Sequence, residues 1–478
     1  MAQDNTQNMV KIIEQSQLAP PHDSVPSTNL PLTYLDIPWF YCHPIKRIFF
    51  YEFPLPTQHF MQQTLPILKH SLSLTLKHFF PFVSKLIVPP QPSIPYIRYI
   101  NGDSLPFTVA ESDANFKVLI SDSPQDVRVL HPFVPSMPSH IVEEDGTRVF
   151  PLMAIQVTVI ADSGFSICLT FNHLAADGKS LHHFLKFWAS VCKAKGDLAS
   201  IESSLPLPFH DRDKVKDPKG LKLIYLNELR DPISKEMEFA GLVRDVSSNK
   251  VRATLILTRD QIEKLKKWVS IKCTTTYNSR TLLHISTFVV TCSLMWASMI
   301  KSEESKGNNN CVTKDYDELC YLILLADCRN IPELSLPSTY FGNCLATGIV
   351  AIKRGIIVGE NGIIEIANAV EREVRDLKSE SDVKKKFDTL MSDYKELGKG
   401  EKSKLVIAGS PKLNVYDTDF GWGRPKKSES VHIESSGSIS LSDCKEKGSG
   451  IEVGLALERI QMNNFTNILE EFLNTIVV

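Results

Sequence analysis

The chain has 478 residues, of which 43% are apolar and 23% charged, and its formal net charge is −2. A globular chain of this length is too long for one ordinary core, so we expect two large domains or three small ones. The near-neutral charge favours neither nucleic acid nor an anionic membrane as a partner, and no run of about 18 apolar residues is present to span a bilayer. The ten cysteines are scattered without metal-ligand spacing, so we expect reduced thiols, a cytoplasmic location and no metal site.

Two alternating segments in the first half predict a β-hairpin. Apolar residues occupy every second position of "MAIQVTVIA" and of "FSICLTFNH", and the short segment "DSG" (162–164) provides a turn between them. The alternation places His173 on the same face as Leu169 and Phe171, facing inward at the end of the second strand.

A helix is predicted directly after this histidine. The apolar positions of the next segment recur at helical spacing, at Leu181, Phe184, Leu185, Trp188 and Cys192. Asp177 and Gly178 suit a helix start, so His173 lies at a strand-to-helix turn where partial burial keeps its imidazole neutral. A neutral imidazole can accept a proton from an alcohol; the alternative is a buried structural histidine beside a capping aspartate.

The rest of the chain mixes strands and helices. The segment 205–220, rich in proline and charge, is the candidate linker. Beyond it, "VRATLILT" predicts a strand, and "TRDQ" (258–261) is a capping box that opens a helix. Near the C-terminus, "SVHIE", "SISLS" and "IEVGLAL" predict strands before a last helix. These patterns favour a mixed α/β fold with substantial antiparallel sheet.

A second motif, "YDTDFGWG" (416–423), follows the segment "KLNVY", which we interpret as a strand. Asp417 and Asp419 flank a turn, and two glycines bracket Trp422. A glycine-aromatic loop of this kind is common by itself. Its occurrence together with the His173–Asp177 cluster, in the other half of the chain, is much less frequent by chance.

The two motifs together resemble those of the BAHD acyltransferases, plant enzymes that move an acyl group from a CoA thioester to an alcohol or amine. The signatures of that family, His-x-x-x-Asp and Asp-Phe-Gly-Trp-Gly, match His173–Asp177 and Asp419–Gly423. The resemblance continues through "LPLTYLDIPWF" (30–40), "PFHDRDKVKDP" (208–218) and "ADCR" (326–329). The segments "YFGNC" (340–344) and "AGSPKL" (408–413) resemble the branch that acylates the sugars of anthocyanins and other phenolic glucosides.

This resemblance implies a two-domain fold similar to that of chloramphenicol acetyltransferase, with a substrate channel between the domains. We expect an N-terminal domain at 1–200, a crossover linker at 201–222 and a C-terminal domain at 223–478. We also expect a monomer that uses acyl-CoA as a co-substrate, holds no bound cofactor, and binds neither nucleic acid nor membrane.

The resemblance also implies roles for the motif residues. His173 would deprotonate the acceptor hydroxyl and return the proton to the CoA thiolate, without an acyl-enzyme, because both substrates are held at once. Asp177 would pair with Arg329 and hold the turn at Gly178. The loop of the second motif would shape the part of the channel that binds CoA. Its members are Asp419, Phe420, Gly421, Trp422 and Gly423. A general-base role is the alternative for Asp419.

Other residues are candidates for binding the two substrates. Lys264, Lys266 and Ser410 are candidates for holding CoA, although an ordinary solvated helix face is the alternative for the two lysines. The candidates for contact with the acceptor or the acyl group are Lys179, Tyr340 and Asn343.

Malonyl-CoA is the favoured donor, because "YFGNC" combined with "AGSPKLNVYDTDFGWG" most resembles malonyl enzymes of that branch. Leu181 stands where some of those enzymes carry an arginine, so other cations would have to hold the malonyl carboxylate, and Lys179 and His182 are nearby. A hydroxycinnamoyl or short aliphatic donor, a naphthoquinone acceptor, and a degenerate member that only binds ligand are the alternatives.

Overall fold

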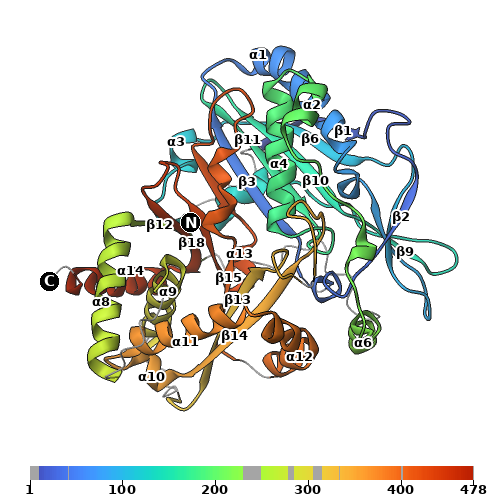
Figure 1. The fold of residues 1–478 in the computed structure, drawn as a ribbon. Helices are drawn as coiled ribbons and strands as arrows, with labels where there is room; N and C mark the ends of the chain where they lie inside the picture. Colours follow the sequence, from blue (N-terminus) through green and yellow to red (C-terminus); the bar gives the residue numbers. More distant parts are fainter. Residues whose placement is uncertain are drawn as a thin grey trace.

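The computed structural model describes residues 10–40, 42–229, 249–277, 285–304, 315–332, 334–399 and 402–476. Within these ranges the chain forms an upper and a lower half, each built on a large mixed sheet with helices packed against it (Figure 1). The predicted mixed α/β class is therefore confirmed.

The upper half contains a six-stranded sheet and a smaller five-stranded sheet. The larger sheet has the order β1 (Val10–Leu18), β6 (Leu105–Ser112), β10 (Met153–Ile160), β11 (Gly164–Phe171), β3 (Ile45–Glu52) and β16 (Lys427–Ser430). The smaller sheet has the order β2 (Thr28–Pro31), β5 (Tyr96–Tyr99), β4 (Lys85–Val88), β9 (Arg148–Pro151) and β8 (Ile141–Val142). The helices of this half are α1 (Thr57–His59), α2 (Leu65–Leu76), α3 (Phe116–Leu119), α4 (Gly178–Lys193) and α5 (Leu198–Ser204), and α2 packs along α4.

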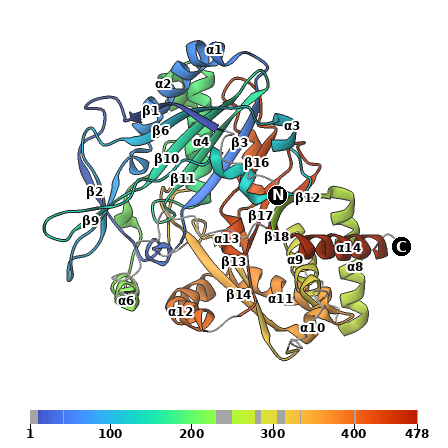
Figure 2. The same ribbon diagram turned by 180° about the vertical axis from the view of Figure 1, so that it is seen from behind.

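The lower half is built on a seven-stranded sheet. Its order is β14 (Leu345–Lys353), β13 (Leu319–Asp327), β15 (Lys404–Ala408), β17 (Ser438–Asp443), β18 (Gly450–Glu458), β12 (Lys250–Thr258) and β7 (Gln125–Asp126). Its helices are α6 (Leu221–Glu228), α8 (Arg259–Tyr277), α9 (Thr287–Glu304), α10 (Arg354–Val358), α11 (Gly362–Asp376), α12 (Glu380–Gly398), α13 (Ile433–Ser436) and α14 (Arg459–Thr475). Figure 2 shows α8, α9 and α14 grouped at the end of this half that carries the C-terminus.

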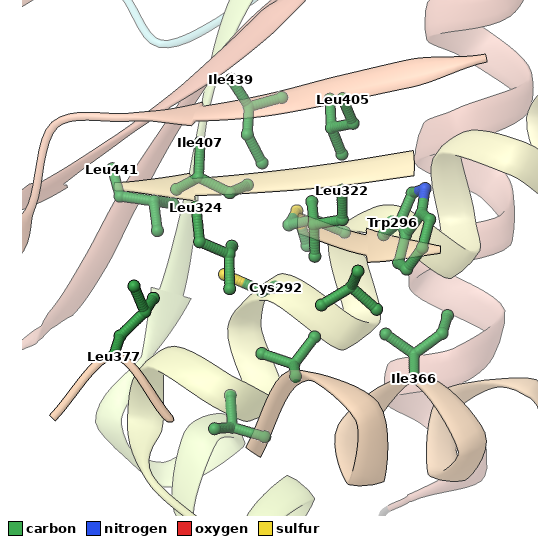
Figure 3. Close-up of a cluster of buried hydrophobic side chains, with 14 of the residues drawn as sticks. Cys292, Trp296, Leu322, Leu324, Ile366, Leu377, Leu405, Ile407, Ile439 and Leu441 are labelled. Carbon is green, nitrogen blue, oxygen red and sulfur yellow. The ribbon is translucent and has the colours of Figure 1, made fainter. Parts of the chain in front are cut away.

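The core of the lower half lies between α9 and the centre of the sheet (Figure 3). Trp296 and Cys292 of α9 pack under aliphatic side chains of three neighbouring strands, which are Leu322, Leu324, Leu405, Ile407, Ile439 and Leu441. Burial of this apolar surface holds the helical layer to the sheet.

The predicted hairpin is confirmed. β10 and β11 pair antiparallel from Met153↔Phe171 to Ile160↔Gly164, and every residue of both strands is buried. At the turn, a Cβ on Gly164 would lie 2.4 Å from the backbone oxygen of Tyr51. Only glycine therefore fits where the hairpin approaches β3.

The helix that follows the hairpin is also confirmed. α4 begins at Gly178, and its apolar stripe, including Trp188, is buried against the upper sheet and α2. The capping box is present as well: the Thr258 amide donates to Gln261 Oε1 at 2.9 Å, and the Gln261 amide donates to Thr258 Oγ1 at 3.2 Å.

Two of the predicted strands are wrong. The strand expected at "SVHIE" ends at Ser430, and the chain then forms the short helix α13. The segment "KLNVY" forms two turns of 3₁₀ helix instead of a strand, because Pro411 lacks an N–H donor and Asn414 adopts a left-handed φ of 48°.

Each half contributes one strand to the sheet of the other. β16, from the C-terminal part of the chain, completes the upper sheet by pairing with β3, and β7, from the N-terminal part, pairs with β12 of the lower sheet. Boundaries of 1–200, 201–222 and 223–478 remain our proposal for the domains, with these two exchanged strands as exceptions that the sequence patterns did not indicate.

Candidate active site

The candidate catalytic histidine lies in the turn that joins β11 to α4. His173 is 8% exposed, and its ring stacks on the indole of Trp39, with 3.9 Å between ring centroids and 10° between planes. Trp39 belongs to a short 3₁₀ helix, Ile37–Trp39, and its indole N–H donates to the carbonyl of Leu35. The stacking fixes one face of the imidazole.

Asn343 fixes the tautomer of this histidine. The amide nitrogen Nδ2 of Asn343 has only acceptors around it: the carbonyls of His173 and Leu174, at 2.9 and 3.1 Å, and Asp36 Oδ1, at 3.2 Å. Its oxygen Oδ1 therefore faces His173 Nδ1, at 3.1 Å. Nδ1 must carry the hydrogen, which leaves Nε2 with a free lone pair.

Burial keeps this imidazole neutral. It lowers the pKa of His173 below its ordinary value, although the nearby Asp177 and Asp36 charges and the Asn343 hydrogen bond oppose the shift. A neutral imidazole with an unprotonated Nε2 is the form that a general base requires.

A buried ion pair lies behind Asn343. Asp36 Oδ2 accepts from Arg212 Nη1 at 2.5 Å, and both side chains are buried. The backbone amide and hydroxyl of Thr33 donate to the same oxygen, each at 2.8 Å. Asp36 therefore has little freedom to move, and its other oxygen positions the Asn343 amide.

The turn itself is held by the expected pair of Asp177 and Arg329. Arg329 Nη2 lies 2.8 Å from Asp177 Oδ2, and both side chains are fully buried. Asp177 also caps α4, since its Oδ1 accepts from the Ser180 amide at 2.9 Å. Because both carboxylate oxygens are engaged in this way, Asp177 acts on the turn and not on a substrate.

Arg329 connects the turn to the segment that carries Asn343. Its guanidinium donates to the carbonyls of Tyr340 and Gly342 and to Asp327 Oδ1. Although burial opposes the charge, Asp177 and then Asp327 raise the pKa of Arg329 above its usual value. This arginine therefore fixes Asp177 and Asn343 relative to one another.

The second motif lies at the other end of α4. Asp419 Oδ2 accepts from Lys193 Nζ at 2.7 Å, and Lys193 is the last residue of α4. At about 1.5 Å of rise per residue, the 16 residues of α4 span about 24 Å. The structure therefore does not bring Asp419 to His173, and it gives no support to a general-base role for Asp419.

Asp419 instead closes its own loop. Its Oδ1 accepts from the amides of Gly421 and Gly423, at 2.8 and 3.0 Å, and both glycines have positive φ. Although burial opposes ionisation, Lys193 and the two amides hold the pKa of Asp419 below its usual value. A carboxylate stabilised in its charged form is a poor proton acceptor.

The aromatic residues of this loop anchor it to the upper half. Phe420 packs edge-on against Trp188 of α4, with ring centroids 4.8 Å apart, and against Tyr51 of β3. Trp422 lies edge-on to Phe53 and Phe165. The loop therefore packs between the C-terminal end of α4 and the six-stranded sheet.

Asn343 and Tyr340, both candidates for substrate contact, are placed against the protein instead. All the polar atoms of the Asn343 side chain bind protein groups, as described above. Tyr340 is 1% exposed, and its carbonyl accepts from Arg329. Both residues build the site and are not in a position to touch an acceptor.

Lys179 is engaged in an ion pair of its own. Its Nζ lies 2.8 Å from Asp327 Oδ2, the carboxylate that also binds Arg329. Leu181, which stands where some malonyl enzymes carry an arginine, is apolar and buried. The structure therefore reduces the case for Lys179 as the group that holds a malonyl carboxylate.

The candidate CoA residues divide into two groups. Ser410 caps the short 3₁₀ helix Pro411–Leu413, and the carbonyl of Leu413 accepts from Lys186 of α4 at 2.9 Å. Ser410 thus lies in a loop beside α4. Lys264 and Lys266 pair with Asp260 and Glu263 on α8, which lies at the outer edge of the lower half in Figure 1. That pairing favours the solvated-face interpretation of the two lysines.

Three residues of the site were missed by the sequence analysis: Asp36, Trp39 and Arg212. All three lie in segments noted for the family resemblance, "LPLTYLDIPWF" and "PFHDRDKVKDP". No local pattern marks them, because each acts through contacts with residues distant in sequence. In the described part of the chain, no cluster of three or more His, Cys, Asp or Glu could hold a metal ion. Within the same ranges, no helix is long and apolar enough to cross a bilayer.

Comparison with known proteins gives consistent matches over the whole chain. A family model described as the Transferase family matches residues 8–472. The chain is 39% identical to coumaroyl-CoA:anthocyanidin 3-O-glucoside-6''-O-coumaroyltransferase 1 of Arabidopsis thaliana, over 96% of this chain and 97% of that protein. It is 36% identical to malonyl-coenzyme A:anthocyanin 3-O-glucoside-6''-O-malonyltransferase of Dahlia pinnata, over 99% of both chains.

The fold is similar to that of solved structures as well. The crystal structure of vinorine synthase superposes with a TM-score of 0.68 over 95% of this chain and 96% of that one, at 19% identity. At this identity the likeness concerns the fold, and it supports the expected two-domain architecture.

The buried pair at the turn leads to a prediction about stability. Asp177→Ala leaves the Arg329 charge in the core without its main partner, and we expect the free energy of unfolding to fall by about 3–5 kcal/mol. Thermal and denaturant unfolding measure the change. Asp327→Ala removes the more exposed of the two carboxylates that pair with Arg329, and it should lower the free energy of unfolding by less. An unchanged melting temperature together with lost activity would mean that Asp177 takes part in the chemistry.

The Asn343 contact leads to a prediction about pH. Asn343→Ala frees the imidazole, and we expect kcat/KM to fall by about 10- to 100-fold because the base is misplaced. The Asn343 hydrogen bond raises the pKa of His173, so its loss should move the acidic limb of the pH–kcat/KM profile to lower pH.

The matched control for this prediction is Asn172→Ala, because the Asn172 side chain accepts from the Leu174 amide at 3.0 Å. That variant should leave the acidic limb in place. An acidic limb that is the same in Asn343→Ala and in the wild type would contradict the assignment.

Proposed function

This chain belongs to the Transferase family, the BAHD acyltransferases, and from that premise we propose that it acylates a hydroxyl of an anthocyanin or other phenolic glucoside. Membership makes it a CoA-dependent acyltransferase, with acyl-CoA as a co-substrate. The observation that carries the chemistry is the 3.1 Å contact between His173 Nδ1 and Asn343 Oδ1, which leaves Nε2 free to accept a proton.

In the proposed mechanism, both substrates are bound at once and His173 moves the proton. Nε2 accepts the proton of the sugar hydroxyl while the hydroxyl oxygen forms a bond to the thioester carbonyl carbon. The carbon–sulfur bond of the tetrahedral intermediate then breaks, and the imidazolium returns the proton to the departing CoA thiolate. The nearby charges of Asp177 and Asp36 favour the transient imidazolium, since both oppose the lowering of the His173 pKa.

The acceptor class is supported by the relatives. The Arabidopsis and Dahlia proteins are named for transfer to the glucoside of an anthocyanidin or anthocyanin, and a tobacco relative, 35% identical, is named phenolic glucoside malonyltransferase 1. These names differ in the acyl group and agree on a phenolic glucoside as acceptor.

We retain malonyl-CoA as the proposed donor and p-coumaroyl-CoA as the second candidate. The malonyl proposal is supported by the named malonyltransferases among the relatives. The coumaroyl candidate is supported by the 39% and 38% identity to two coumaroyltransferases of Arabidopsis. We also propose that the chain acts as a cytoplasmic monomer.

Removal of the base tests the mechanism. In His173→Ala we expect kcat to fall by about 10² to 10⁴, with CoA binding retained. The matched control is His183→Ala, since the His183 ring contacts the carbonyl of Pro206 at 2.8 Å and packs edge-on against Phe79. Release of CoA thiol in steady-state assays measures the rate, and turnover by His173→Ala within tenfold of the wild type would exclude His173 as the base.

A comparison of donors tests the proposed acyl group. With one flavonoid glucoside as acceptor, we expect kcat/KM to be higher for malonyl-CoA than for acetyl-CoA or p-coumaroyl-CoA. Lys179→Met should leave this order unchanged, because Lys179 is already paired with Asp327. A preference for p-coumaroyl-CoA above tenfold would replace the malonyl assignment by the second candidate and leave acyl transfer itself intact.

A further inference from the structure

Two aromatic rings lie beside the imidazole of His173. The indole of Trp39 is parallel to it, with 3.9 Å between ring centroids and 10° between planes. The ring of Phe171 is 6.3 Å away and tilted by 31°. The face of an aromatic ring attracts a cation that lies within about 6 Å of its centroid. Of these two rings, only Trp39 meets this distance.

The indole of Trp39 is held in place by its own segment. Its Nε1 donates to the carbonyl of Leu35 at 3.1 Å, and its backbone amide donates to the carbonyl of Asp36 at 3.1 Å. The side chain also packs against the hydrophobic core of the upper half. Because Asp36 is fixed by its ion pair with Arg212, the indole is in position before any proton moves.

The charge of the ring that faces Trp39 changes during the proposed reaction. His173 is neutral at rest and becomes an imidazolium when Nε2 takes the proton of the acceptor hydroxyl. An aromatic face carries negative partial charge, so it attracts the imidazolium and has little electrostatic effect on the neutral ring. An interaction that is stronger after proton transfer than before it lowers the barrier of that step.

Other titratable groups also act on the imidazole of His173. Asp177 and Asp36 oppose the lowering of its pKa that burial causes, but each carboxylate is already paired with a buried arginine. His432, at the start of α13, has a pKa that burial lowers to about 3, so it stays neutral near pH 7. Trp39 differs from all of them, because its ring is in direct contact with the imidazole and carries no counter-charge.

We propose that Trp39 is a positioning residue that stabilises the imidazolium form of His173 through the face of its indole, and so strengthens the base that accepts the acceptor proton. This inference rests on the proposed function. An aliphatic side chain of similar volume would also pack against the imidazole, but it would not respond to the charge that forms there. The sensitivity of the rate to the electron density of the indole therefore distinguishes this role from packing alone.

The first test changes the electron density of the indole and leaves its shape nearly unchanged. Mono-, di- and trifluorotryptophan are introduced at position 39 by nonsense suppression, because each fluorine weakens the attraction of the ring face for a cation. We expect the single-turnover rate of acyl transfer to fall steadily with the number of fluorines, by about 3- to 10-fold in total. The acidic limb of the pH–kcat/KM profile should move to lower pH, because the imidazolium of the free enzyme loses the same support.

The same series at Trp296 is the matched control. Trp296 is buried on α9, in the core of the lower half, so its fluorination should leave the single-turnover rate and the acidic limb as in the wild type. A rate and a limb that stay constant along the series at position 39 would overturn the inference and leave Trp39 as a packing residue.

Two ordinary substitutions give an independent comparison. Trp39→Phe and Trp39→Leu both lose the hydrogen bond to Leu35, but only the first retains an aromatic face. We expect the single-turnover rate to fall by about 2- to 5-fold in Trp39→Phe and by about 10- to 30-fold in Trp39→Leu. Equal rates and equal acidic limbs in the two variants would contradict a role for the ring face. If thermal unfolding shows that either variant folds poorly, the fluorotryptophan series decides.

An NMR titration of the His173 imidazole gives a readout that does not depend on turnover. Its signal is identified by its loss in His173→Ala, and its pKa should fall along the fluorotryptophan series. A pKa that moves while the single-turnover rate stays constant would exclude a part for Trp39 in the reaction. If no phenolic glucoside is acylated from any donor, the proposed function fails, and the titration still decides whether the indole stabilises the imidazolium.

Discussion

The protonation state of His173 depends on a chain of buried hydrogen bonds that crosses the whole site. Arg212 and Thr33 hold Asp36, Asp36 holds the Asn343 amide, and Asn343 in turn accepts from Nδ1 of the histidine. If any link rotated, the Asn343 oxygen would no longer face Nδ1, and Nε2 could carry the proton instead. The catalytic property of a single imidazole is thus set by residues that never touch a substrate.

This chain of contacts assembles only when both halves of the protein are in place. Asp36 and His173 come from the first 200 residues of the chain, Arg212 from the crossover segment, and Asn343 and Arg329 from the C-terminal part. The crossover segment also pairs with the Asn343 segment, through the bridge between Phe209 and Tyr340. Each buried charge is costly unless its partner is present, so the ion pairs favour one relative placement of the halves. The same energetics thereby couple folding to the assembly of the site.

Local sequence patterns were sufficient where the structure is local. The hairpin before His173, the capping aspartate and stripe of α4, and the capping box at Thr258 follow from periods of 2 and 3.6 residues and from short-range hydrogen bonds. The family resemblance added His173, Asp177 and Arg329 correctly as a group in space. Neither source could find Asp36 or the exchange of β16, which depend on contacts hundreds of residues apart. The strand predicted at "KLNVY" does not form, because Pro411 lacks an N–H donor and Asn414 adopts a left-handed conformation.

The same geometry separates the chemistry from the choice of donor. His173, Asn343, Asp36 and the Asp177–Arg329 pair act on the proton and on the turn, and none of them depends on which acyl group is attached to CoA. Relatives that use coumaroyl and malonyl donors can therefore share this unit. Selection has to come from side chains that face the acyl group.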